Sequence, residues 1–122
     1  MSNILPTEDI NIADQYIILN LLIDTLEREL KSIEASTIRL QKPYLELTEN
    51  ILRQGRKELI ATKQLMRKKG IRVFDKTIRN EDFWDYKYLI RGYEGNFNYL
   101  KYALKMKMEK RLMEFFNLAM SK

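Results

Sequence analysis

The chain contains no cysteine and no histidine, and it has little proline or glycine. Without cysteine and histidine it cannot form a disulfide, a thiolate zinc site, a cysteine nucleophile or an imidazole general base. Its four glycines make neither a dinucleotide-binding fingerprint nor a phosphate-binding loop. The small-enzyme chemistries that need these groups are therefore excluded, and we expect a protein that is not an enzyme and has no cofactor.

A long hydrophobic run is also missing. The most apolar stretch, residues 16–23, already contains Asn20 and is far shorter than the roughly 20 residues of a membrane-spanning helix. The N-terminus lacks the basic segment and the apolar run of a secretory signal peptide. We expect a cytoplasmic protein without a membrane segment, in which residues 1–10 form a flexible arm and residues 11–122 form one domain.

Two sets of carboxylates come closest to a metal site. The first would have to meet across helices, and helical di-iron sites characteristically add a Glu-x-x-His motif that this chain cannot supply. The second lies on a loop but has no recognised cation-binding spacing. We interpret both sets as solvated surface and predict no metal site; they are Glu27, Glu34 and Glu49, and Glu81, Asp82 and Asp85.

The first predicted element is a long helix over residues 13–40. Its apolar residues recur at spacings that alternate between four and three, which is typical of the seam of a left-handed helical packing. The seam consists of Ile12, Tyr16, Leu19, Ile23, Leu26, Leu30, Ile33, Thr37 and Leu40. Thr7 or Asn11 is the candidate N-cap, and the helix must end before Pro43.

A second helix is predicted over residues 44–69, followed by Gly70 as its terminator. Large and small residues alternate along one of its faces, each kind repeating every seven positions. They are Leu45, Leu52, Leu59 and Met66, with Thr48, Gly55 and Thr62 between them. Such a face lets another helix approach closely. It either packs on the first helix in an antiparallel hairpin or binds the same face of a second copy.

After Gly70 the residues become β-branched and aromatic, and residues 71–93 are predicted to form a small antiparallel β-hairpin with a long polar loop. A last helix is predicted over residues 95–119. It carries two apolar stripes, which need either burial between two layers or a contact between copies of the chain. The expected fold is mainly α with a minor β part: a long antiparallel helical hairpin, a small β-hairpin and a long C-terminal helix.

The net charge of +5 is unevenly distributed along the chain. Residues 1–50 carry four basic and nine acidic side chains, whereas residues 53–79 carry ten basic and two acidic ones. Either the acidic first helix neutralises the basic second helix along their seam, or the basic segment contacts the phosphates of a nucleic acid. The basic residues are Arg53, Arg56, Lys57, Lys63, Arg67, Lys68, Lys69, Arg72, Lys76 and Arg79.

Eight of the thirteen aromatic residues lie within residues 83–102. They form either the core that joins the hairpin to the helices or a surface for a protein partner, because Tyr, Trp and Arg are common at binding hot spots. Arg91 and the adjoining Gly92-Tyr93 turn are the first choice for a contact point. The candidate contact residues are Trp84, Tyr86, Tyr88, Arg91, Tyr93 and Tyr99.

The order of several short motifs resembles a known group of proteins. The motifs are Leu40-Gln41-Lys42-Pro43-Tyr44, the helix end Arg67-Lys68-Lys69-Gly70-Ile71-Arg72-Val73, Phe83 with Tyr86 and Tyr88, and Arg91-Gly92-Tyr93-Glu94 followed by Phe97 and Tyr99. Over roughly residues 20–116 the chain resembles small uncharacterised proteins encoded in phages and prophages of low-GC Gram-positive bacteria. The resemblance implies a mobile-element setting and assigns no residue a role, because such proteins have no established activity.

Three functions are compatible with these patterns. Our leading hypothesis is a non-enzymatic interaction or regulatory protein that binds a host or phage protein through the aromatic hairpin and self-associates into a homo-oligomer. The alternative is a nucleic-acid-binding regulatory or packaging accessory that uses residues 53–79. A further alternative is a structural component of a larger assembly.

Overall fold

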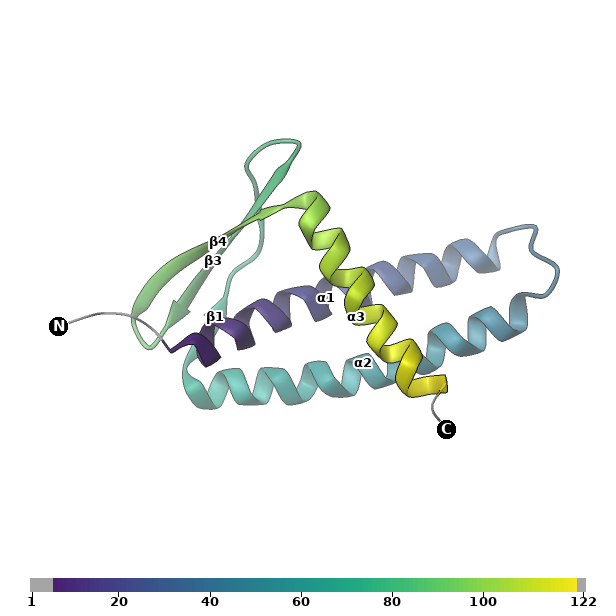
Figure 1. Ribbon diagram of the computed structural model, residues 1–122, viewed down its shortest axis with the longest axis horizontal. Helices are drawn as coiled ribbons and strands as arrows, with labels where there is room; N and C mark the ends of the chain where they lie inside the picture. Colours follow the sequence, from purple (N-terminus) through teal and green to yellow (C-terminus); the bar gives the residue numbers. More distant parts are fainter. Residues whose placement is uncertain (1–5, 121–122) are drawn as a thin grey trace.

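Two long antiparallel helices form the base of the fold, and a sheet and a third helix pack on them (Figure 1). The computed structural model describes residues 6–120. The sheet lies against the end of the helical hairpin where the first helix begins, and the third helix crosses the hairpin near its middle. This arrangement confirms the predicted fold class. The elements are α1 (Thr7–Glu34), α2 (Gln41–Lys69), β1 (Ile71–Val73), β2 (Thr77–Ile78), β3 (Phe83–Ile90), β4 (Tyr93–Leu100) and α3 (Lys101–Met120).

The two long helices pack through the seam that the sequence indicates. Gly55 on α2 faces α1, because a methyl group added at this glycine would lie 3.4 Å from Ile23 Cγ1 and 3.9 Å from Leu19 Cδ1. Leu52 and Met66 of the same face are buried. The antiparallel hairpin is therefore confirmed. The face of α2 that was alternatively expected to bind a second copy is occupied by α1.

The first helix begins six residues earlier than predicted, at Thr7. The carbonyl oxygen of Pro6 accepts the amide hydrogens of Asp9 and Ile10, with N···O distances of 3.1 and 3.3 Å. Pro6 is therefore the N-cap residue, and neither polar side chain suggested by the sequence caps the helix. The second half of the predicted flexible arm is thus helical from Thr7 onward, whereas residues 1–5 lie outside the described residues.

The first helix also ends six residues earlier than predicted, at Glu34. The Ser36 hydroxyl donates to the carbonyl oxygen of Ile33 at 2.6 Å and accepts the amide hydrogen of Ile38 at 3.3 Å. Serine side chains that satisfy backbone groups in this way compete with helical hydrogen bonds. The last two positions of the predicted seam consequently lie in an exposed loop.

The strands form one antiparallel sheet in which β3 pairs with each of the other three. The antiparallel pairing predicted within residues 71–93 is confirmed, because β1 pairs with β3 and Ile71 lies opposite Ile90. The short strand β2 pairs with the first half of β3, and β4 pairs with β3 along its whole length. Ile71 and Ile90 are both buried in a cluster with Ile12, Ala13 and Met66, which fastens the sheet to α1 and α2.

The sequence prediction misses β4 and starts the last helix six residues too early, at residue 95 instead of Lys101. Arg91 and Gly92 have φ angles of 47° and 89°, and positive values at both central residues are what a tight two-residue hairpin turn requires. Beyond the turn, the odd-numbered residues of 95–99 are at least half-buried and the even-numbered ones are exposed. This period of two is that of a strand.

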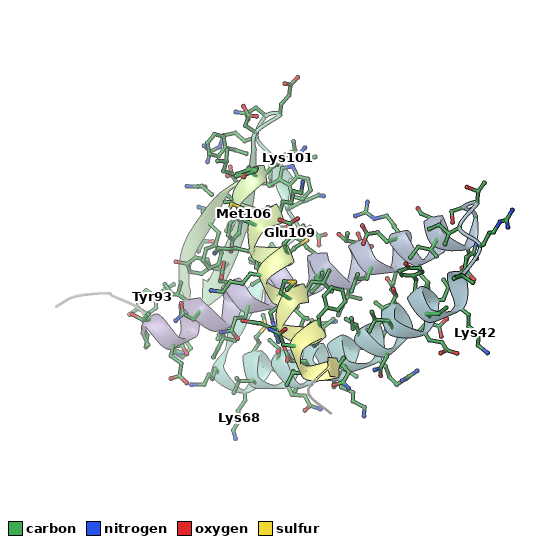
Figure 2. The ribbon with its side chains drawn as sticks, turned by 45° about the vertical axis from the view of Figure 1, so that its right-hand side comes forward. Lys42, Lys68, Tyr93, Lys101, Met106 and Glu109 are labelled. Atoms are coloured by element: carbon green, nitrogen blue, oxygen red, sulfur yellow. The ribbon has the colours of Figure 1, made fainter. Side chains whose placement is uncertain are left out.

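The third helix buries only one of its two apolar stripes. Leu104 and Phe115 are buried, and they pack in separate clusters against α1 and the elements beside it. The side chains of Tyr102, Met106 and Met113 are more than half exposed, and Met106 is labelled in Figure 2. These three members of the second stripe are therefore left exposed by the described part of the chain, whereas Phe116 packs against the core.

Substitution of Gly55 tests the close approach of α1 and α2. Gly55→Ala is expected to leave the free energy of unfolding unchanged or to raise it by up to about 1 kcal/mol, because alanine favours the helix and its methyl group fits beside Ile23. Gly55→Leu is expected to lower it by about 1–3 kcal/mol through overpacking. Urea denaturation followed by circular dichroism measures both values. Equal stability of the two variants would contradict the close packing.

Candidate functional site

Arg91, the first choice for a contact point, joins three elements of the fold. Its main-chain amide donates to the carbonyl oxygen of Gly70 at 3.0 Å. Its guanidinium donates from Nη1 to the carbonyl oxygen of Lys69 at 2.6 Å and from Nη2 to Asp9 Oδ2 at 2.5 Å. The β3–β4 turn, the end of α2 and the start of α1 thus meet at this side chain. We therefore assign Arg91 a structural role.

Asp9 is the anion at the centre of this junction, and it is the only buried charged residue in the described part of the chain. Lys69 Nζ lies 3.7 Å from its Oδ1 atom. The hydrogen bond from Arg91, together with the positive charges of Arg91 and Lys69, outweighs desolvation and lowers the pKa of Asp9 from its ordinary value of 3.8. Sequence reasoning missed Asp9, because the sequence does not show whether a single carboxylate near the N-terminus is buried beside cations or exposed in a flexible arm.

Most of the predicted aromatic contact surface belongs to the core. Tyr86 and Tyr99 are each 7% exposed, and their rings meet edge to face with centroids 5.8 Å apart. The Tyr99 hydroxyl donates to Asp14, whose carboxylate also accepts a 3.1 Å hydrogen bond from Lys107, and burial followed by the Asp14 bond raises the pKa of Tyr99. Paired strands direct alternate side chains to one face, so these rings converge on α1. The prediction that Tyr86 and Tyr99 are surface contacts is therefore wrong.

The other aromatic candidates do not form one patch. Trp84 is half-buried, with Lys76 Nζ 3.6 Å from the centroid of its ring, and it lies opposite Tyr99 in the sheet. Tyr93 is 46% exposed but lies at the other end of the same strand pair. Tyr88 is half-buried and lies over Gly95, where a methyl group would collide with its ring. All three lie on the same face of the sheet as Tyr86 and Tyr99, but they are spread along its length, and Tyr93 is the exposed one of the three.

The ten basic candidates divide into two groups. Three of them have carboxylate partners: Arg56 with Glu27 at 2.7 Å, Arg79 with Asp85 at 2.9 Å, and Lys69 with Asp9 and Glu8 at 3.7 Å. The other seven are exposed and form no ion pair within the described residues; they are Arg53, Lys57, Lys63, Arg67, Lys68, Arg72 and Lys76.

The acidic groups of α1 explain why so few cations are neutralised. Asp14 binds Lys107 of α3, and Asp24 pairs with Arg28 one turn further along α1 at 3.4 Å. Glu27 reaches across to Arg56 of α2, and Glu8 and Asp9 reach Lys69 at the end of α2. Neutralisation by α1 therefore accounts for a minority of the basic segment.

Three hollows adjoin this basic segment, with volumes of about 310, 290 and 390 Å³. The first two share Arg67 and Arg72, and the last two share Tyr16 and Val73, so the three hollows adjoin one another, and we treat this row of hollows as one groove. We call it the basic groove and define it by its cations and aromatic rings: Lys63, Arg67, Arg72, Lys76, Arg91, Tyr16, Phe74 and Tyr86.

The groove combines an apolar floor with a cationic rim. Met66 and Ile71 are buried beneath the middle hollow, beside the half-buried ring of Tyr16. Lys63, Arg67 and Arg72 are exposed around it. Asp75 is the one carboxylate among the residues that line the three hollows. Such a surface suits a ligand that has both a flat apolar group and negative charge.

The carboxylates that the sequence analysis considered for a metal site stay apart. Glu27 binds Arg56, and Asp85 binds Arg79. Within residues 6–120, no three acidic side chains come together in a way that could hold a metal ion. In the same residues, none of the helices combines the length and the hydropathy needed to cross a bilayer.

Acidification is expected to weaken the Asp9 junction. The pKa of Asp9 is lower in the folded chain than in the unfolded one, so its contribution to stability is complete above the unfolded value of about 4 and is lost as the pH falls through the folded value. Asp9→Asn should therefore lower the urea midpoint at neutral pH and reduce the loss of stability in acid. Glu29→Gln, which changes an exposed carboxylate of α1 outside the junction, is the control. An Asp9→Asn variant with the pH dependence of the wild type would contradict this assignment.

Comparisons with known proteins agree with the Gram-positive part of the resemblance. "Uncharacterized protein YhjD" from Bacillus subtilis (strain 168) is 33% identical over 95 residues, which cover 78% of each chain. No solved structure matches the chain. The model of the family described as "YhjD protein" matches residues 4–120. The chain therefore belongs to the YhjD protein family.

Proposed function

We propose that this protein binds nucleic acid through the basic groove and acts as a small regulatory or packaging accessory, not as an enzyme. The observation that carries the proposal is the set of exposed cations without carboxylate partners among the described residues, four of which line the groove: Lys63, Arg67, Arg72 and Lys76. Contacts between such cations and phosphates supply most of the sequence-independent affinity for nucleic acids.

The distribution of contacts reverses the order of our two main hypotheses. The aromatic hairpin was the basis for a protein partner, but Tyr86 and Tyr99 are buried and Arg91 is held by Asp9. The charge-neutralisation interpretation argued against nucleic acid, yet Arg67 and Arg72 face solvent without an anionic neighbour in the described residues. The basic segment is thus better supported as a binding surface than the aromatic segment.

The setting of this function is also part of the proposal. The mobile-element origin implied by the resemblance and a cytoplasmic location both fit a protein that meets nucleic acid directly. A structural role in a larger assembly would require many copies of the chain to associate. The feature that bears on association is the exposed stripe of α3.

Self-association is a second candidate activity, favoured by the exposed apolar stripe of Tyr102, Met106 and Met113. We propose a second copy of the chain as the occupant. The exposed neighbours on α3 include both Lys105 and Glu109, so the helix offers each copy both signs of charge. An oligomer formed in this way leaves the basic groove open, because no α3 residue lines it.

Removal of the groove's positive charge tests the nucleic-acid function. The triple variant Lys63→Gln, Arg67→Gln, Arg72→Gln is expected to bind a fluorescent DNA oligonucleotide at least tenfold more weakly in low salt. Its plot of log affinity against log salt should lose about 0.7–0.9 of slope for each phosphate contact removed. Fluorescence anisotropy across a salt series measures both quantities.

The matched control for this experiment removes three exposed charges away from the groove: Arg39→Gln, Lys105→Gln and Lys110→Gln. It should bind like the wild type, and circular dichroism should be unchanged for both variants. An absence of wild-type binding to any DNA or RNA in low salt would refute the function. Equal weakening by the two triple variants would refute the groove as its site.

Charge on the exposed stripe tests self-association. Met106→Lys combined with Met113→Lys is expected to convert oligomers into monomers, because it places like charges on the proposed contact. Ile60→Lys, which alters an exposed apolar residue of α2, should leave the oligomers intact. Sedimentation velocity at micromolar concentrations measures the distribution of species. A wild type that stays monomeric throughout would contradict this candidate activity.

A further inference from the structure

The middle of the basic groove is built around one aromatic ring. Tyr16 lines both the 290 Å³ hollow and the 390 Å³ hollow, so its ring lies where the two hollows meet. The side chain is half-buried, which leaves part of it open to a ligand. Aromatic rings in cationic grooves are the platforms on which unpaired bases stack, and every base has the flat face that this requires.

A second ring, Phe74, lies in the same groove and is already flanked by cations. The Arg72 guanidinium carbon is 4.9 Å from the centroid of this ring, and Lys87 Nζ is 5.9 Å from it. Phe74 and Tyr16 both line the 390 Å³ hollow. The two rings lie at the β1 edge of the sheet, Tyr16 on the α1 side and Phe74 on the side of Arg72 and Lys87. A strand that passes round this edge places bases on both rings and phosphates on the cations between them.

The shape of the groove favours a single strand over a duplex. Lys63 and Arg67 lie one turn apart on the flank of α2, and they line a hollow together with Arg72 of β1. A duplex is usually contacted by an element that projects into its major groove. Here the cations line shallow hollows instead of a projecting element, and each hollow of about 290–390 Å³ is at the small end of the range for small-molecule sites.

We infer that the basic groove binds single-stranded nucleic acid in preference to duplex, an inference that rests on the nucleic-acid function proposed above. Bases lie on Tyr16 and Phe74, and phosphates bind Lys63, Arg67 and Arg72.

The preference is tested with a fluorescent oligothymidylate and a fluorescent hairpin duplex that has the same number of phosphates. The wild type is expected to bind the single strand at least tenfold more tightly at the same low salt. Tyr16→Leu should weaken single-strand binding by roughly 5- to 100-fold, as expected for the loss of a stacking platform, and Tyr16→Phe should retain it. Phe74→Leu provides a second test of stacking at a different ring, should Tyr16→Leu disturb the fold.

A matched pair of charge variants tests the position of the strand. Lys63→Gln removes a charge that lines the groove, whereas Lys68→Gln removes one from the same helix that does not line any of the three hollows and that extends away from the fold in Figure 2. Lys63→Gln should weaken single-strand binding and lower its salt slope by about 0.7, and Lys68→Gln should change neither.

The possible failures separate the two proposals. If the wild type binds neither probe, the proposed function itself is refuted. If it binds the duplex as tightly as the single strand, nucleic-acid binding stands and the preference for single strands is refuted. If both leucine variants are folded and bind like the wild type, stacking is refuted, and an equal effect of Lys63→Gln and Lys68→Gln would refute the placement in the groove.

Discussion

A single buried carboxylate and its two cationic partners hold the fold together at one end. Asp9 accepts a hydrogen bond from Arg91 and lies near Lys69, so the start of α1, the end of α2 and the β3–β4 turn depend on one another. Removal of Arg91 from the closed fold would leave the buried charge of Asp9 without its hydrogen-bond partner, which costs much more than the loss of an exposed ion pair. Arg91 also has a left-handed backbone conformation, which the turn needs and which few residues other than glycine adopt.

The basic groove follows from this junction. Because Gly70 ends α2 and passes directly into β1, Arg67 and Arg72 come from different elements and still line the same two hollows. The sheet is fastened to α1 by Ile71 and Ile90, which brings Tyr16 of α1 to the side of β1. The acidic groups that could have closed the groove are directed elsewhere, with Asp14 bound to Lys107 on α3. The groove thus forms where the helix pair and the sheet meet.

The aromatic residues fill the space between the sheet and the helices. A short sheet packed on two helices has few positions with which to fill the space between the layers, and Tyr86 and Tyr99 fill it with rings. The Tyr99 hydroxyl is satisfied by Asp14, so a large side chain is buried without leaving a polar atom unpaired. The density of aromatic residues therefore reflects packing between the sheet and the helices.

The sequence by itself determined the elements whose signal is local. The seven-residue repeat around Gly55 identified the face that packs on α1, Gly70 marked the end of α2, and the run that begins at Ile71 was recognised as a strand. It did not determine β4, because the spacing from Phe97 to Leu104 also fits a helical stripe, and only the reversal of the chain at Arg91 shows that the segment is a strand. Tertiary structure alone decided which charges are paired and which line a groove. The physical reason is that periodicity specifies which side of an element is buried, whereas the partner of a side chain depends on how distant elements come together.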